Sequence, residues 1–216
     1  MKKVLVVAAH LDDEILGCGG TLLKHAKDGD IVDVCIVTSP KKEIWTEEYS
    51  KKKNNQAKEV DKILGTRKRY YADFPSVSLN TISSADLNGK VGKIINDSDP
   101  DIIYTHHKGD INIDHRFVYE AVMVNTRPID KKISVFCFET VSSTEWSNES
   151  FTPNFYVDVS EFLDTKIEMF YKYDSEVKTF PHPRSRQGII TLAKKRGMDI
   201  CIHNAEAFQV ARSYWV

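Results

Sequence analysis

Three carboxylates and one imidazole fall within five consecutive positions near the start of the chain: His10, Asp12, Asp13 and Glu14, directly after an apolar run at residues 3–8. Ionised groups at the end of a buried segment are unfavourable unless they are paired or bound to an ion. His10 and Asp13 lie three residues apart across a predicted tight turn. We therefore expect both to bind one divalent cation, while Asp12 faces another direction.

A second polar segment, residues 105–115, follows a later apolar run and reads Thr-His-His-Lys-Gly-Asp-Ile-Asn-Ile-Asp-His. In a doubly wound parallel sheet of order 3-2-1-4-5, the connections after strands one and four leave in opposite directions and open a crevice. The two polar segments should face each other across it. A histidine of the second segment would then complete a His, Asp, His set with one open position, which is the arrangement of catalytic zinc.

The elements that place these segments alternate between strand and helix patterns. We expect strands at 3–8, 31–38, 69–74, 101–105, 133–139 and 208–215, and helices at 15–27, 46–64, 84–96, 115–126, 161–176 and from about 185 onward. This alternation predicts an α/β fold with a Rossmann-like, doubly wound, mainly parallel sheet flanked by helices. We expect residues 1–216 to form a single domain, in which the less regular part 140–216 completes the site.

Both polar segments also have purely structural explanations. Asp12, Asp13 and Glu14 can cap the following helix and complement its dipole, and the later histidines can be ordinary loop residues. Their coincidence at one predicted crevice favours the metal site. The stretch 17–20, Gly-Cys-Gly-Gly, lacks the GxGxxG spacing of a dinucleotide loop, and the preceding acids would repel a pyrophosphate.

The composition narrows the range of partners and locations. With 30 basic and 31 acidic residues interleaved along 216 positions, the net charge is −1. That balance argues against a nucleic-acid or anionic-membrane partner. The apolar run near the N-terminus is too short for a signal-peptide core or a bilayer span. We expect a cytoplasmic protein without stable membrane insertion.

At these residues the sequence resembles the LmbE and PIG-L family of zinc-dependent N-deacetylases, which are GlcNAc de-N-acetylase-like. The similar stretches are residues 9–14, in which Leu11 replaces the usual proline, residues 17–21, and the Asp-His pair at 114–115. Residues 104–116, 143–146, 182–185 and 205–208 also look like one subgroup of this family. The resemblance spans essentially the whole chain.

The resemblance implies that His10, Asp13 and His115 bind Zn²⁺ and that Asp12 is the general base. Many members have a histidine three residues before the last ligand, where it steadies the transition state. This sequence has Asn112 there. We expect another histidine to take that role.

The first candidate for this catalytic role is His182, and His107 is the second. We further expect Asp110 and Asp114 to orient the ligand imidazoles, since such outer carboxylates are common at metal sites. Arg184 is a candidate for binding an acidic group of the substrate.

The expected reaction removes the N-acetyl group from an N-acetylated amino sugar or its conjugate and gives acetate and a free amine. A metal-dependent deacylase of a non-sugar amide is one alternative, and a non-catalytic binding module that keeps the fold is another. The resemblance also implies a homo-oligomer, although no sequence feature fixes the number of subunits. The identity of the acetylated compound stays open.

Overall fold

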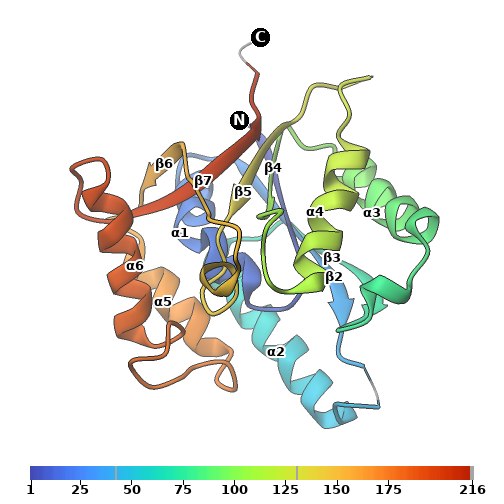
Figure 1. The fold of residues 1–216 in the computed structure, drawn as a ribbon, viewed down its shortest axis with the longest axis horizontal. Helices are drawn as coiled ribbons and strands as arrows, with labels where there is room; N and C mark the ends of the chain where they lie inside the picture. Colours follow the sequence, from blue (N-terminus) through green and yellow to red (C-terminus); the bar gives the residue numbers. More distant parts are fainter. Residues whose placement is uncertain (42, 130, 215–216) are drawn as a thin grey trace.

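A seven-stranded sheet runs through the centre of the computed structural model, which describes residues 1–41, 43–129 and 131–214 (Figure 1). The strands are β1 (Lys3–Ala8), β2 (Ile31–Ser39), β3 (Lys68–Pro75), β4 (Ile102–His106), β5 (Ser134–Phe138), β6 (Phe155–Asp158) and β7 (Ala205–Arg212). Their order is β3-β2-β1-β4-β5-β7-β6. Strands β1 to β5 pair in parallel, whereas β7 pairs antiparallel with β5 and β6. The predicted order of the first five strands and the mainly parallel sheet are confirmed.

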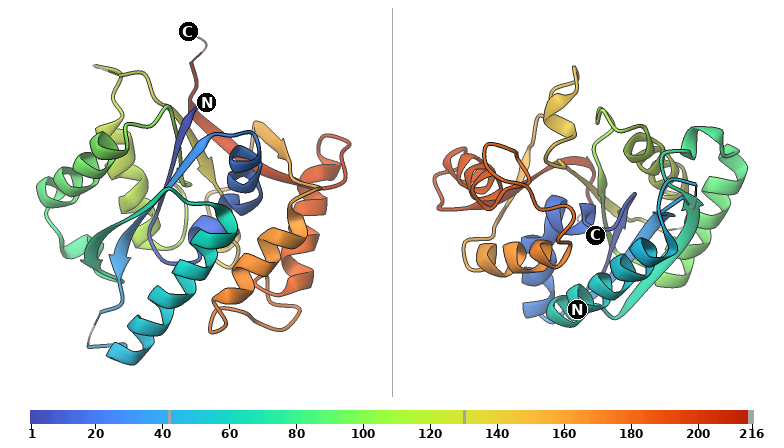
Figure 2. Two further views of the ribbon diagram at one scale, coloured as in Figure 1. Left: turned by 180° about the vertical axis from the view of Figure 1, so that it is seen from behind. Right: turned by 90° about the horizontal axis from the view of Figure 1, so that it is seen from below.

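Helices cover both faces of this sheet, as Figures 1 and 2 show. One face carries α1 (Asp13–Lys27), α2 (Glu47–Leu64), α5 (Leu163–Lys172) and α6 (Arg186–Met198). The other carries α3 (Ser84–Ser98) and α4 (Ile113–Asn125). Two short 3₁₀ turns, η1 (Leu79–Thr81) and η2 (Thr144–Trp146), lie in the loops. No helix among the described residues has both the length and the apolar character needed to cross a membrane.

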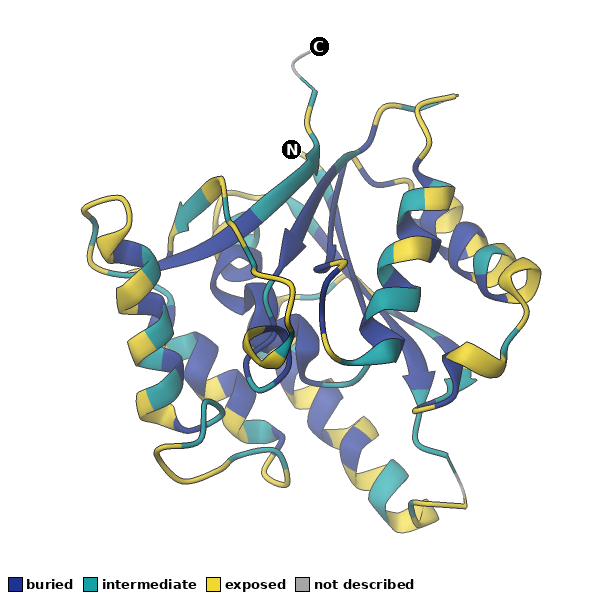
Figure 3. Ribbon diagram, in the orientation of Figure 1, coloured by how far each residue is buried: buried dark blue, intermediate teal, exposed yellow. Residues whose placement is uncertain are grey.

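Strand β1 explains why the core has two halves. Val4, Val6 and Ala8 belong to the apolar cluster under α1 and α5, while Leu5 and Val7 belong to the cluster under α3 and α4. Successive side chains of a strand point to opposite faces, so a strand covered on both sides reads as a continuous apolar run. Figure 3 shows the buried strands between helices whose outer surfaces are exposed.

Helix α1 is broken at Cys18, whose φ of −146° is not helical. The break frees the backbone N–H groups of Gly20 and Thr21, and these donate to the buried carboxylate of Glu206 at 2.8 and 2.7 Å. The Lys166 ammonium lies 2.6 Å from the same carboxylate. An ion pair from the C-terminal part of the chain therefore stabilises the first helix.

Several element boundaries differ from the sequence-based expectation. Helix α4 begins at Ile113, two residues earlier than predicted, because the Asn112 side chain accepts the Asp114 backbone N–H at 2.9 Å and caps it. Helix α5 ends at Lys172, short of the predicted position 176.

At the C-terminus, β7 begins at Ala205 and ends at Arg212, and the predicted end of this strand at Trp215 lies outside the described residues. Strand β6 was not predicted, because its four half-buried or exposed residues give no clear apolar alternation.

Candidate active site

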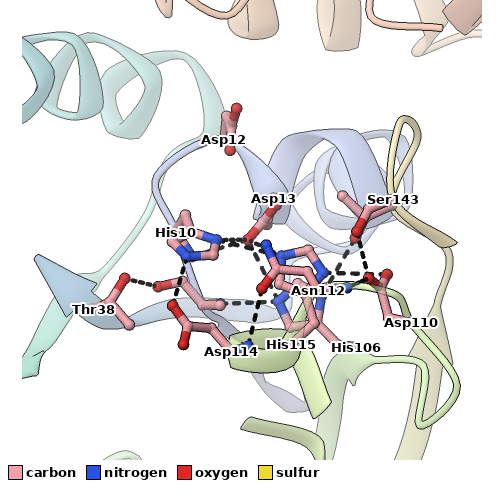
Figure 4. A network of polar contacts seen from close by, with 12 residues as sticks. His10, Asp12, Asp13, Thr38, His106, Asp110, Asn112, Asp114, His115 and Ser143 are labelled. Carbon is pink, nitrogen blue, oxygen red and sulfur yellow. Dashed lines mark hydrogen bonds and ion pairs between the residues drawn. The ribbon is translucent and has the colours of Figure 1, made fainter. Parts of the chain in front are cut away.

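The two polar segments meet where β1 and β4, which are adjacent in the sheet, end. Three donor atoms form a triangle there: His10 Nδ1 lies 3.1 Å from Asp13 Oδ2, and His115 Nε2 lies 3.2 Å from Asp13 Oδ2 and 3.3 Å from His10 Nδ1. Figure 4 shows these side chains pointing toward one another. The prediction that they converge is confirmed, and they form a group that could hold a metal ion.

The size of this triangle can be compared with that of a metal ion. A tetrahedral zinc with bonds of about 2.0–2.1 Å keeps its neighbouring ligand atoms about 3.3–3.4 Å apart. The three observed separations, 3.1 to 3.3 Å, are close to that value. The donor set and its dimensions therefore fit a small divalent cation with one position left for a water molecule or a substrate.

Each imidazole of the triangle has its second nitrogen beside a carboxylate. His10 Nε2 lies 3.2 Å from Asp114 Oδ2, and His115 Nδ1 lies 3.2 Å from Asp110 Oδ2. Metal-ligating histidines usually have such a partner, which sets the tautomer and orientation of the ring. Asp110 and Asp114 thus occupy the places expected of them.

The two outer carboxylates are themselves held from different parts of the chain. Asp114 accepts the backbone N–H groups of Val77 and Leu79 at 2.6 and 3.1 Å. Asp110 accepts hydroxyl hydrogen bonds from Ser143 and, at 2.6 Å, from Thr144. The orientation of the triangle therefore depends on the loop after β3 and on the loop after β5.

The protonation equilibria show that the cluster attracts positive charge. Burial opposes protonation of His10, but Asp114 and Asp13 outweigh it and raise the pKa of His10 to about 10. Burial likewise opposes protonation of His115, yet Asp13 and Asp110 raise its pKa. Burial favours the neutral form of Asp13, but the neighbouring imidazoles hold its pKa well below the usual range. A divalent cation would compete with these protons for the same lone pairs.

His106, which the sequence analysis left without a role, packs against the triangle. Its ring stacks on that of His115 with centroids 3.8 Å apart, and its Nε2 accepts the Ala9 backbone N–H at 2.9 Å. Burial and the nearby positive charge of His115 lower the pKa of His106 to about 3, so it stays neutral. On its other side lies Phe138, whose ring fills the space where Gly17 of α1 lacks a side chain. His106 therefore supports His115 by packing.

Asp12 lies beside the triangle but faces another direction, as expected. Its backbone has the unusual φ of 116°, held by the Glu14 carboxylate, which accepts the Asp12 N–H at 2.9 Å. This strained conformation lets consecutive carboxylates diverge, and Figure 4 shows Asp12 apart from the three donor atoms. Burial raises the pKa of Asp12 to about 7, although the Arg184 charge acts in the opposite direction.

Arg184, the candidate for binding an acidic substrate group, lines the cavity and also contacts three side chains of the protein. Its guanidinium donates to Asp12 at 2.9 Å, to Glu176 at 3.0 Å and to the Ser142 hydroxyl at 2.8 Å. Glu176 also pairs with the buried Lys53 at 2.6 Å. The cations and carboxylates thus form a network around Asp12, which no local sequence pattern indicated.

A cavity of about 250 Å³ lies over the triangle. The polar or charged side chains that line it include Asp12, His10, His115, Asn112, Arg184, Glu176, Lys53, Ser76 and Ser143. Leu11, Pro40, Trp45, Tyr49 and Val77 add apolar surface. The cavity therefore combines the triangle, Asp12 and Asn112 in a space large enough for a small polar group.

Neither of the two histidines expected to replace the one missing at position 112 lines this cavity. His182 accepts the Arg184 backbone N–H at 3.1 Å, and its ring faces that of Trp146. His107 is buried, and its ring packs edge-on against Phe151. Asn112 itself does line the cavity. Asn112, three residues before His115, therefore lies at the cavity, whereas neither His107 nor His182 does.

Comparisons with known proteins identify the family of the chain. The model of the PIG-L family, GlcNAc-PI de-N-acetylase, matches residues 5–125. The deacetylase YaiS of Escherichia coli K12, itself uncharacterised, is 28% identical over 179 residues, which cover 81% of this chain and 91% of YaiS.

Two solved structures share the fold. The N,N′-diacetylchitobiose deacetylase of Pyrococcus horikoshii has a TM-score of 0.80 at 19% identity, over 97% of this chain and 83% of its own. GalB of Pseudomonas putida KT2440, a 4-carboxy-2-hydroxymuconate hydratase, has a TM-score of 0.78 at 18% identity, over 100% and 98% of the two chains. Proteins with this fold thus catalyse more than one reaction. The family of this chain must therefore be assigned from the sequence match. Because the family model covers more than half of the 216 residues, including all three donor residues of the triangle, this protein belongs to the PIG-L (LmbE-like) family of deacetylases.

Proposed function

We propose that the protein is a zinc-dependent N-deacetylase, which hydrolyses the acetamide of an N-acetylated amino sugar or its conjugate to acetate and a free amine. One observation carries this proposal. The triangle of His10, Asp13 and His115 matches the ligand spacing of tetrahedral zinc, and each imidazole has a carboxylate beside its other nitrogen.

His10, Asp13 and His115 would hold the metal ion. When bound, zinc lowers the pKa of a water molecule to about 7 and polarises a carbonyl group. The carboxylates of Asp110 and Asp114 keep the two imidazoles in the tautomer that presents a lone pair to the ion. The chain's other residues supply proton transfer and stabilisation of charge.

Asp12 is the general base in this proposal. Its carboxylate takes a proton from the attacking water and later delivers it to the nitrogen of the departing amine. A base whose pKa lies near the working pH is best suited to both transfers, and burial raises the pKa of Asp12 to about 7.

Asn112 is our choice for the role that a histidine has in other family members. Its side-chain oxygen is engaged by the Asp114 N–H, which leaves the amide N–H₂ group to donate. From the cavity wall this group can stabilise the acetyl oxygen as negative charge develops on it. We therefore prefer Asn112 to His182.

Two sets of variants test the assignment of metal ligands and base. His10→Ala, Asp13→Ala and His115→Ala should each lose bound zinc, measured by metal analysis of the purified protein. Asp12→Asn should retain zinc and lose about 10²- to 10⁴-fold in acetate release. Asp97→Asn, an exposed carboxylate on α3, is the matched control and should resemble the wild type.

The substrate class is tested with the zinc-loaded wild type on a panel of N-acetylated sugars and N-acylated amino acids. Acetate release from the sugars alone supports the proposal, whereas turnover of the amino acids alone supports a deacylase of non-sugar amides. Unchanged zinc content in all three ligand variants would contradict the proposed site.

A further inference from the structure

A second cavity adjoins the one over the triangle. We call the cavity over the triangle the inner cavity and the second one, of about 550 Å³, the outer cavity. Leu11, Thr38, Pro40 and Trp45 line both of them. The two cavities are therefore neighbours that meet at Trp45.

The volumes of the two cavities favour a ligand that extends into both of them. Ligand pockets usually measure about 300–1,000 Å³. The inner cavity, at about 250 Å³, lies below that range, whereas the outer cavity lies within it. The inner cavity alone is thus small for a complete substrate, and the remainder of the molecule has a place directly beside it.

The junction between the cavities carries an aromatic platform. Trp45 stacks on Tyr49, with ring centroids 6.4 Å apart and planes 20° from parallel. The Lys53 ammonium lies 5.7 Å from the Tyr49 ring on the inner side. Rigid aromatic faces bury apolar area at low entropic cost, and the C–H face of a pyranose ring is a suitable partner for them.

The charges of the outer cavity restrict the ligand further. Among its described lining residues only Glu47 and Asp73 carry a formal charge, and both are acidic. Glu47 pairs with the Lys51 ammonium at 2.9 Å, so the cavity disfavours a phosphate group chiefly beside Asp73. The Ser39 hydroxyl donates to Asp73 Oδ1 at 2.9 Å, which leaves the other carboxylate oxygen to accept from a ligand hydroxyl. Ser50 and Asn54 add further hydrogen-bonding groups.

We propose that the substrate is a neutral glycoside, in which the N-acetylated sugar is linked to at least one further uncharged sugar ring. The acetamide enters the inner cavity, and the second ring stacks on Trp45 in the outer cavity. This inference rests on the proposed deacetylase function and makes Trp45 a residue that determines specificity.

Kinetics with the zinc-loaded enzyme test the proposal. N-acetylglucosamine, N,N′-diacetylchitobiose and UDP-N-acetylglucosamine serve as the single sugar, the neutral disaccharide and the phosphate-bearing conjugate. We expect kcat/KM for the disaccharide to exceed that for the single sugar by roughly tenfold. The nucleotide sugar should show no such gain. Equal values for the single sugar and the disaccharide, or a preference for the nucleotide sugar, would overturn the inference.

Variants locate the effect. Trp45→Ala removes the platform, and Asn54→Trp fills the outer cavity from the exposed side of α2. In both variants, kcat/KM for the disaccharide should fall close to kcat/KM for the single sugar, so that their ratio is near one. Trp146→Ala removes an exposed indole that lines neither cavity, and should leave this ratio unchanged. An unchanged ratio in Trp45→Ala would contradict the assignment.

Binding separates this inference from the proposed function. Calorimetry with the zinc-loaded Asp12→Asn variant measures disaccharide affinity without turnover. In one outcome, the wild type hydrolyses no sugar, while the disaccharide still binds and Trp45→Ala lowers its affinity. That result would support the outer subsite and contradict the proposed reaction. If the sugars are hydrolysed but the disaccharide binds no more tightly than the single sugar, the result would support the proposed reaction and contradict the outer subsite.

Discussion

The parallel part of the molecule, residues 1–138, and the C-terminal part, residues 139–214, contribute to the site in different ways. All three donor atoms of the triangle come from segments that follow β1 and β4: His10 from the loop after β1, Asp13 from the first residue of α1, and His115 from the first turn of α4. The C-terminal part supplies partners for the residues around them: Ser143 contacts Asp110, and Arg184 contacts Asp12. The donor atoms thus come from the two strand-to-helix connections at one sheet edge, while their orientation and electrostatic setting depend on contacts across the whole fold.

The C-terminal part also supports the parallel part away from the site. The buried pair of Lys166 and Glu206 belongs to the C-terminal part, yet it satisfies backbone groups of α1 that the break at Cys18 leaves free. Because Asp13 and Glu14 begin this helix, the C-terminal part holds in place the element that carries a donor residue. Substitutions in the two parts should therefore change different measurable properties.

The largest effect on stability is expected for Lys166→Met. It leaves the Glu206 carboxylate buried without its charged partner, which should reduce the free energy of unfolding by about 3–5 kcal/mol. Urea denaturation measures the change, and Lys194→Met, an exposed lysine on α6, is the control. The folded variant should still bind one equivalent of zinc. Loss of zinc from the folded variant would contradict the view that this ion pair affects stability without affecting metal binding.

An intermediate effect is expected for Asp110→Asn. The amide no longer stabilises His115 by charge, so zinc affinity should fall by about 10- to 100-fold, as measured by competition with a chelator. Ser143→Ala, which removes one hydrogen bond to Asp110 from the C-terminal part, should weaken zinc binding less. A larger loss of zinc affinity in Ser143→Ala than in Asp110→Asn would contradict the proposal that the C-terminal part acts on the metal site only through Asp110.

The smallest effect is expected for Arg184→Met, which should leave zinc bound and change the pH dependence. Asp12 must be a carboxylate to act as a base, and Arg184 lowers the pKa of Asp12 against the effect of burial. Removing the guanidinium should raise this pKa and move the acidic limb of the kcat profile to higher pH by about one unit. The rate at neutral pH falls and recovers at higher pH.

Arg186→Met, two residues away and exposed, is the matched control for this pH profile. A shift of the acidic limb toward lower pH, or no shift, would argue against Asp12 as the titrating base.

Much of the parallel half could be predicted from the sequence. The apolar run of β1 reports burial on both faces, and the order of strands one to five follows from alternating strand and helix patterns. Once β1 and β4 are neighbours, the polar segments that follow them must meet at one edge of the sheet. The convergence of His10, Asp13 and His115 was therefore determined by local periodicity and topology.

Other features were decided only by the tertiary structure. Arg184 and Asp12 are 172 residues apart, and no periodic pattern relates them. Trp45 of the loop before α2 reaches the cavity, whereas His182, the histidine expected there, does not. The physical reason is that sequence periodicity reports which face of an element is buried, but not which distant side chain packs against it. Those contacts arise only when the helices and loops of both parts close over the sheet.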